Sequence, residues 1–199
     1  MQEHGLTREQ VMSASAASLQ SLGRSGAQEA SEENGIHKIL KPTDVLKEVH
    51  HFKTGTLFQC IWAIPLAIEP IKKTAVSHLL EALYNIGMGC QILDDMVDFY
   101  GDLQQKRHNY IISLIYHKSN LAGRSRLLEL AKRNLTQDER NTALNEFPEV
   151  RLAEEQTALS YLESGLKVLL SEDHRFLTAP AISFMAKRIG ADSLMTVFE

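Results

Sequence analysis

Apolar residues recur at intervals of three and four along most of the chain, which is the spacing of one face of an α-helix. The pattern predicts helices over Val45–Ile68, Val76–Phe99, Tyr110–Ala131 and Val150–Leu170, and a last helix around Ala181–Ile189. No run of alternating β-branched residues between turn signals occurs, so we expect no strands. The sequence therefore predicts an all-α fold, a bundle of at least five long helices.

Helix boundaries support this division of the chain. Thr136 is followed three positions later by Glu139, which is a capping-box pattern. Pro148 and Pro180 lie at expected breaks between helices. The segment Ser13–Asn34 is rich in Ser, Ala, Gly and Glu. That composition fits either close packing between helices or a loosely ordered connection, and the sequence leaves both interpretations open.

Size and charge narrow the class of protein. With 199 residues, 44% of them hydrophobic, residues 1–199 are expected to form a single domain with its own core. The chain has 21 Lys and Arg against 25 Asp and Glu and a net charge of −4. It contains no basic block that would neutralise a run of phosphates, so nucleic acid is not an expected partner.

Cysteine usage and hydropathy indicate a protein of the cytoplasm. Cys60 and Cys90 have no C-x-x-C spacing, so neither a disulfide framework nor a zinc site is expected. Met1–Gln10 has no apolar core typical of a secretory signal. The longest apolar stretch, Leu57–Ile68, is too short to cross a bilayer, so we expect no transmembrane segment.

Acidic residues are concentrated between Gly87 and Asp102. On a helix, Asp94, Asp98 and Asp102 share one face, with Asp95 beside them and Gln91 one turn before Asp94. Like charges at this spacing repel each other by about 0.2–0.5 kcal/mol per pair. Mg²⁺ prefers carboxylate oxygens and usually keeps water and substrate phosphates as its other ligands. The alternatives are a solvated helix end, or pairing with Lys and Arg of neighbouring helices.

A second stretch of interest is Lys53-Thr54-Gly55, about forty residues earlier. It offers a positive charge, a hydroxyl and a small residue that permits close approach, and these suit a phosphate contact. By itself, however, such a triplet also occurs by chance, and a lysine is usually an exposed surface residue without a ligand.

Two other groups of polar residues are not expected to take part in a functional site. His50 and His51 are adjacent and would point about 100° apart on a helix, so a surface or core-edge position is expected for both instead of metal ligation. Glu29, Glu32 and Glu33 lie among Ser, Ala, Asn and Gly. We interpret them as a solvated helix face.

Taken together, the two chemical stretches resemble the trans-isoprenyl diphosphate synthases, or polyprenyl synthetase family. The resemblance is carried by Lys53-Thr-Gly-x-Leu-Phe and by Gly87-x-x-x-Gln-Ile-x-Asp-Asp-x-x-Asp-x-x-Gly-Asp, in this order. It implies a class I isoprenoid synthase helical bundle around a deep cavity. It also implies Mg²⁺-dependent condensation of an allylic diphosphate with isopentenyl diphosphate.

The resemblance assigns roles to particular residues. Lys53 matches the lysine that contacts the allylic diphosphate, and Thr54 matches its neighbour near the reacting carbons. Gln91 matches a substrate-binding glutamine one turn before the second aspartate-rich motif. The implied metal ligands are Asp94, Asp95 and Asp98, of which Asp94 and Asp98 are expected to bind the metal directly or through water.

The chain also departs from the family pattern. Members carry a first aspartate-rich motif nearly a hundred residues before the Lys-Thr pair, but only 52 residues precede Lys53, with Asp44 their one aspartate. The basic residues that receive isopentenyl diphosphate are missing too. The resemblance thus covers about the C-terminal two-thirds of a synthase, and we expect a domain incomplete at its N-terminus.

The expected function is a polyprenyl diphosphate synthase-like transferase, acting as a partial or atypical chain in a homodimer or heteromer. The alternative is a non-catalytic or regulatory subunit of a heteromeric prenyl diphosphate synthase. A terpene cyclase or head-to-head synthase is a third reading, but no Asn-x-x-x-Ser-x-x-x-Glu motif follows Asp102. Product chain length is not fixed by the sequence.

Overall fold

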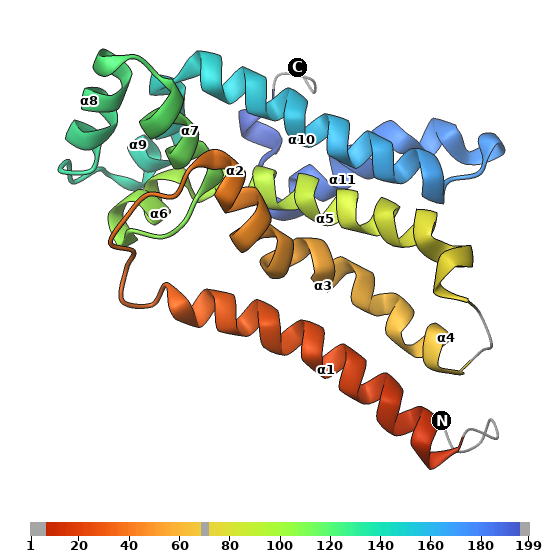
Figure 1. Cartoon of the computed structure of the whole chain (residues 1–199). Coiled ribbons are helices and arrows are strands. Elements are labelled where there is room, and N and C mark those ends of the chain that lie inside the picture. The colour runs from red at the N-terminus through yellow and green to blue at the C-terminus, as the bar shows by residue number, and fades with distance from the viewer. Residues whose placement is uncertain (1–6, 69–71, 196–199) are drawn as a thin grey trace.

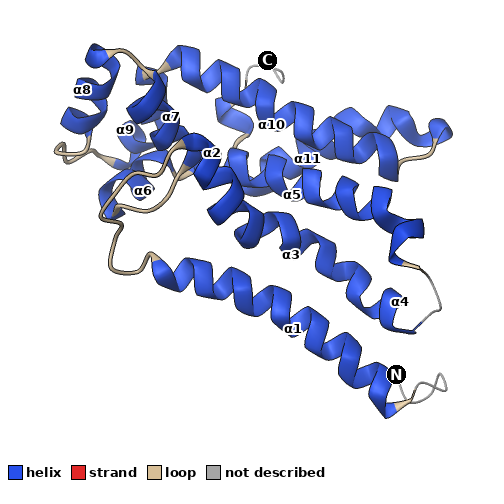
Figure 2. Ribbon diagram, in the orientation of Figure 1, coloured by secondary structure: helices blue, strands red, loops and turns tan. Residues whose placement is uncertain are grey.

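The structure, a computed structural model, describes residues 7–68 and 72–195. These residues form helices joined by short turns and loops, and no strand occurs among them (Figure 2). The predicted all-α fold is confirmed.

The helices follow one another closely along the chain. They are α1 Arg8–Ser31, α2 Pro42–Asp44, a π-helical segment Val45–Gly55, α3 Thr56–Phe58, α4 Ala63–Ile68, α5 Ser77–Val97, α6 Phe99–Gln105, α7 Tyr110–Lys118, α8 Leu121–Leu130, α9 Gln137–Thr142, α10 Pro148–Leu169 and α11 Thr178–Ile189. Short 3₁₀ turns join several of them.

Helix α5 is the central element of the bundle (Figure 1). It packs most extensively against α10 on one side and against the π-helical segment and α3 on the other. Helix α1 forms an outer layer over α4 and the π-helical segment. The short helices α6 to α9 gather at one end of the long helices (Figure 1).

Glycines let α5 and α10 approach each other closely. A Cβ atom at Gly165 would lie 2.5 Å from the main-chain oxygen of Ala82, and one at Gly89 would lie 2.9 Å from that of Ala158. Side chains beside these glycines, such as Ile92 on α5, are fully buried. Tight packing of this pair fixes the position of α5, on which the acidic motif lies.

The helix boundaries settle the questions that the sequence left open. Ser13–Asn34 belongs largely to α1, which begins at a capping box between Thr7 and Gln10. The expected single helix Tyr110–Ala131 is wrong, because Asn120 caps a new helix by accepting from the Gly123 NH at 2.9 Å.

The capping box at Thr136 is confirmed, since its side chain and that of Glu139 bond each other's main chain. No helix within the described residues is both long enough and apolar enough to cross a membrane.

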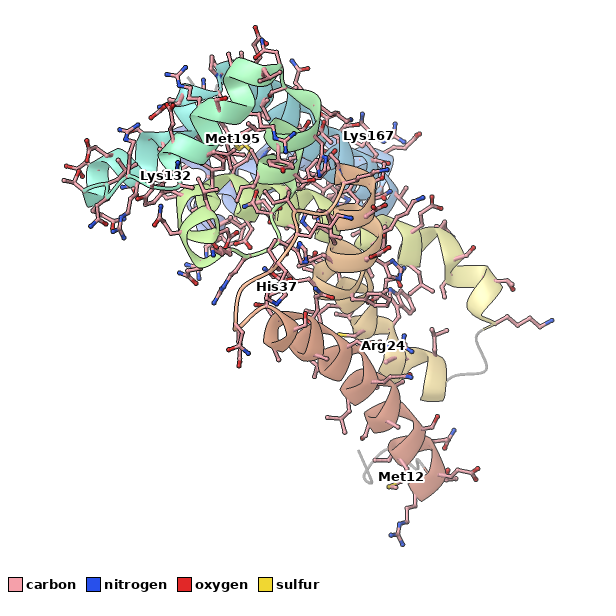
Figure 3. The ribbon with its side chains drawn as sticks, turned by 60° about the vertical axis from the view of Figure 1, so that its left-hand side comes forward. Met12, Arg24, His37, Lys132, Lys167 and Met195 are labelled. Atoms are coloured by element: carbon pink, nitrogen blue, oxygen red, sulfur yellow. The ribbon has the colours of Figure 1, made fainter. Side chains whose placement is uncertain are left out.

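Helix α1 is attached to the bundle by few buried side chains. Ala14 is its one buried residue, whereas Met12 and Leu19 are 62% and 66% exposed. Figure 3 shows Met12 near the end of α1 that projects from the rest of the molecule. Ile61 and Ile64, in the apolar stretch that α1 partly covers, are also exposed. An apolar surface therefore follows α1 and its neighbours.

Candidate functional site

The Lys-Thr pair lies at the C-terminal end of the π-helical segment, against α5. Gly87 on α5 makes this contact possible, because a Cβ atom there would lie 2.8 Å from the main-chain oxygen of Thr54. π-Helical turns are rare and often occur at functional sites. The close approach brings Lys53 and Thr54 beside the turn of α5 that carries Gln91 and Asp94.

These residues line one cavity of about 300 Å³. Its lining residues come from α1, the π-helical segment, α3, α5 and α11, and they are Ser25, Glu29, Lys53, Thr54, Leu57, Cys90, Gln91, Asp94 and Ile189. Four of the residues singled out in the sequence are thus brought together, namely Lys53, Thr54, Gln91 and Asp94. The cavity also has an apolar part, formed by Leu57 and Ile189.

Lys53 is held in the cavity by α1. Its Nζ lies 3.2 Å from Oε1 of Glu29, and its main-chain oxygen accepts a hydrogen bond of 2.9 Å from the hydroxyl of Ser25. Burial lowers the pKa of Lys53, but the carboxylates of Glu29, Asp95 and Asp94 outweigh it and raise the pKa above its usual value. The cavity therefore contains an ammonium group whose charged form is favoured by the neighbouring carboxylates.

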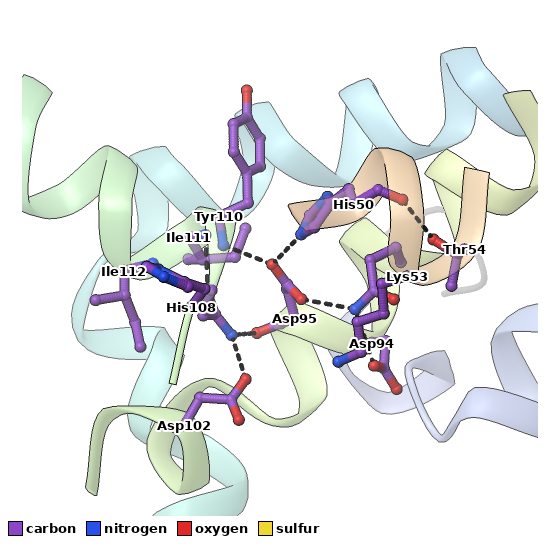
Figure 4. A network of polar contacts seen from close by, with 12 residues as sticks. His50, Lys53, Thr54, Asp94, Asp95, Asp102, His108, Tyr110, Ile111 and Ile112 are labelled. Carbon is purple, nitrogen blue, oxygen red and sulfur yellow. Dashed lines mark hydrogen bonds and ion pairs between the residues drawn. The ribbon is translucent and has the colours of Figure 1, made fainter. Parts of the chain in front are cut away.

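Asp95 is buried, and both of its carboxylate oxygens accept hydrogen bonds from the protein (Figure 4). Oδ2 lies 2.9 Å from Nε2 of His50 and accepts from the main-chain NH of Tyr110. Oδ1 accepts from Nε2 of Gln91 at 2.9 Å. Asp95 thereby ties the π-helical segment, α5 and the start of α7 together.

Gln91 connects this buried network to the cavity. Its Nε2 donates to Oδ2 of Asp94 at 3.1 Å as well as to Asp95. Burial, and next the charge of Asp98, raise the pKa of Asp94, while Lys53 and Gln91 lower it. The negative charge of Asp94 at the cavity wall is therefore only partly offset by Lys53 and Gln91.

Asp98 follows Asp94 by one helical turn, at the point where α5 ends. Its main-chain NH donates to the oxygen of Asp94 at 2.8 Å, and the NH of Asp102 donates to the oxygen of Asp98 at 2.8 Å. Helical hydrogen bonding thus continues through the boundary between α5 and α6. The side chain of Asp98 is exposed, so Asp94 and Asp98 present neighbouring carboxylates.

These two carboxylates fit a magnesium ion that is shared with a phosphate ligand. Within residues 7–68 and 72–195, no three His, Cys, Asp or Glu side chains converge as a ready-made metal site. Mg²⁺ is commonly bound through one or two carboxylates plus substrate phosphates and water, and does not need an all-protein cage. Asp94 and Asp98 supply that minimal donor set, whereas the oxygens of Asp95 are already in use.

Asp102 lies next to this network. Nδ2 of Asn109 donates to Oδ2 of Asp102 at 3.0 Å and to the main-chain oxygen of Asp95 at 2.7 Å. Oδ1 of the same Asn109 side chain caps α7. Burial, supported by the charges of Asp95 and Asp98, raises the pKa of Asp102 to about 7 despite the bond from Asn109.

The raised pKa of Asp102 predicts how stability depends on pH. The folded state binds a proton at Asp102 between about pH 4 and pH 7, where the unfolded state does not, so this residue lowers stability progressively as the pH rises through that window. Asparagine does not titrate, so Asp102→Asn should reduce the fall in the free energy of unfolding across this window by about 2 kcal/mol, after allowance for solvent screening. Urea denaturation of both proteins at pH 5 and pH 8 tests this, and parallel changes in the two proteins would contradict it.

Several residues near the site were missed or misread from the sequence. His50 is fully buried against Asp95, although a surface or core-edge position was expected. The interpretation of the three glutamates as a solvated face is wrong for Glu32, which is 8% exposed and accepts from the His108 NH at 2.8 Å. Glu29 pairs with Lys53. No local pattern signals these contacts, because each joins segments far apart in the sequence.

Gly87 offers a test of the packing that places Thr54. Gly87→Ala should lower the free energy of unfolding by about 1–3 kcal/mol, because its Cβ would meet the Thr54 oxygen at 2.8 Å and the Phe58 ring at 3.1 Å. The matched control is Gly101→Ala in α6, where nothing lies within 4 Å and alanine should be neutral or stabilising by up to about 1 kcal/mol. Equal effects of the two substitutions on urea denaturation would show that Gly87 is not required for the close contact.

Comparisons with known proteins identify the family of the chain. A search of curated proteins and a search of solved structures each returned no match. The family model described as polyprenyl synthetase matches residues 6–140, a range that holds both the Lys-Thr pair and the aspartate-rich motif. Because that match covers more than half of the sequence, the chain belongs to the polyprenyl synthetase family.

Proposed function

We propose that the chain is a Mg²⁺-dependent prenyltransferase of isoprenoid biosynthesis that condenses an allylic diphosphate with isopentenyl diphosphate. The observation that carries the proposal is the single cavity lined by Lys53, Thr54, Gln91 and Asp94, which are separated by up to about forty residues in the sequence. Family membership supports prenyl transfer in general.

The cavity has chemically different parts that suit the two parts of an allylic diphosphate. The ammonium of Lys53 would bind diphosphate oxygens, and Leu57 and Ile189 provide an apolar surface for the prenyl group. Thr54 lines the same cavity, and its hydroxyl donates to the main-chain oxygen of His50 at 3.4 Å. These residues would orient the substrate with its diphosphate toward α5.

Asp94 and Asp98 would hold Mg²⁺, and Asp95 would position Asp94 through Gln91, which donates to both carboxylates. When bound, Mg²⁺ would stabilise the negative charge that develops on the diphosphate as its C–O bond breaks. Lys53 adds a fixed positive charge to the same group. The allyl cation that is formed would then be attacked by the double bond of isopentenyl diphosphate, which releases a proton.

A second candidate function is that of a subunit in a heteromeric prenyl diphosphate synthase. It is favoured by the exposed apolar residues on α1 and beside it, including Met12, Leu19 and Ile61. Exposed apolar surface of this kind often marks a contact with another chain. In this arrangement a partner would supply the first aspartate-rich motif and the residues that bind isopentenyl diphosphate.

Turnover of labelled isopentenyl diphosphate separates the two candidates. The purified chain is incubated with farnesyl diphosphate and radiolabelled isopentenyl diphosphate, with Mg²⁺ or with EDTA. Transferase activity predicts Mg²⁺-dependent incorporation that Lys53→Ala abolishes. Binding of farnesyl diphosphate without incorporation would favour the subunit, and absence of both would contradict the proposed function.

A further inference from the structure

Glu29 on α1 forms an ion pair with Lys53, the residue that would bind the diphosphate in the proposed function. Oε1 of Glu29 lies 3.2 Å from Nζ of Lys53, and both residues line the cavity. Glu29 is half exposed, at 48%, whereas Lys53 is 28% exposed. The pair therefore lies at the cavity wall, where an incoming anion would meet both charges.

The charges of the cavity are unfavourable for a free diphosphate. Two carboxylates, Glu29 and Asp94, line it with one ammonium group, Lys53, and Asp98 adds a further negative charge nearby. A metal-free diphosphate would have to displace Glu29 from Lys53 and then remain close to both carboxylates. Like charges in such proximity repel each other, and partial burial of the site strengthens the repulsion.

A metal-complexed diphosphate does not meet the same obstacle. Mg²⁺ neutralises part of the charge of the anion and is itself attracted by Asp94 and Asp98. The carboxylate of Glu29 then lies near a ligand of lower net charge. Its presence costs the complexed diphosphate less than it costs the free anion.

We propose that Glu29 is a specificity-determining residue that makes diphosphate binding conditional on the metal. It neutralises Lys53 in the absence of ligand and discriminates against diphosphates that arrive without Mg²⁺. This proposal rests on the proposed function, because it assumes that Lys53 receives the diphosphate. It assigns to α1 a part in substrate selection that neither sequence motif contains.

Attachment of α1 to the cavity supports this assignment. Ser25, one turn before Glu29, donates to the main-chain oxygen of Lys53 at 2.9 Å. One turn after Glu29, the buried Glu32 accepts from the His108 NH at 2.8 Å and from the Gln28 amide at 2.9 Å. Contacts on both sides therefore fix the C-terminal turns of α1, and Glu29 is held against Lys53 by the fold.

The test uses inorganic diphosphate as the probe. Its binding is measured by isothermal titration calorimetry with Mg²⁺ and with EDTA, on the parent and on Glu29→Gln. We expect the parent to bind diphosphate at least about 100-fold more tightly with Mg²⁺. In Glu29→Gln, binding in EDTA should become about 10-fold tighter, whereas binding in Mg²⁺ should change less. The ratio of the affinity in Mg²⁺ to the affinity in EDTA should therefore fall.

The matched control is Glu33→Gln, which removes the same charge from an exposed position just beyond α1 and should leave the ratio unchanged. An unchanged ratio in Glu29→Gln would overturn the inference. Weaker binding of the Mg²⁺ complex by Glu29→Gln, with no gain in EDTA, would also overturn it and would identify Glu29 as a metal ligand. Absence of binding to the parent under both conditions would instead contradict the proposed function itself.

Discussion

Replacing Asp94 with alanine is expected to weaken Mg²⁺-dependent binding of an allylic diphosphate by about 100-fold or more, with the helical fold intact. The carboxylate lies at the cavity wall, one turn from Asp98, and its negative charge is only partly offset by Lys53 and Gln91. Loss of one of the two carboxylates that we propose to bind Mg²⁺ would remove a large part of the metal's attraction to the site. Calorimetric titration with farnesyl diphosphate and Mg²⁺ measures the effect, and circular dichroism measures helix content.

The control for this substitution is Asp173→Ala, which removes an exposed carboxylate that does not line the cavity. It should bind the Mg²⁺–diphosphate complex as the parent does. If Asp94→Ala also binds as tightly as the parent, the assignment of Asp94 to the metal is wrong.

Asp95→Ala is expected to have its largest effect on stability. The side chain is 2% exposed and accepts hydrogen bonds from His50, Gln91 and the main chain of Tyr110. Removal of the acceptor leaves the donors of His50 and Tyr110 without this partner in the protein interior, while Gln91 keeps its hydrogen bond to Asp94. We expect the free energy of unfolding to fall by about 3–5 kcal/mol, as measured by urea denaturation.

Asp98→Ala is the matched comparison within the same motif. Asp98 is exposed at the end of α5, so its removal should change the free energy of unfolding by no more than about 0.5 kcal/mol. It should nevertheless weaken Mg²⁺-dependent binding. A stability loss at Asp98 equal to that at Asp95 would contradict the distinction between Asp95 as a buried structural carboxylate and Asp98 as an exposed carboxylate proposed to bind the metal.

The sequence predicts those parts of the fold that depend on helical periodicity. The expected helices Val76–Phe99 and Val150–Leu170 correspond closely to α5 and α10, because each carries a continuous apolar face and packs against the other. Periodicity fails where a cap interrupts it, as Asn120 does between α7 and α8. It also gives no sign that Val45–Gly55 is π-helical.

The candidate site is predictable only as far as its motifs extend. Spacing within each motif, together with the family resemblance, points to six residues, of which the cavity brings four together, Lys53, Thr54, Gln91 and Asp94, but not Asp95 and Asp98. The motif does not indicate that Asp95 is buried and hydrogen-bonded to the protein, because one of its partners, His50, lies 45 residues away in the sequence. Likewise, Glu29 faces Lys53 only because α1 folds back over the π-helical segment.

The most direct test of the central claim is calorimetric titration of the purified 199-residue chain with farnesyl diphosphate, with Mg²⁺ and with EDTA. If Mg²⁺ is bound by Asp94 at the cavity wall and by the neighbouring Asp98, and diphosphate is bound by Lys53, then binding in Mg²⁺ should be saturable, should be removed by EDTA and should be weakened by Lys53→Ala. Binding of equal strength in EDTA, or no binding under either condition, would contradict the claim that this cavity takes up a metal-complexed allylic diphosphate.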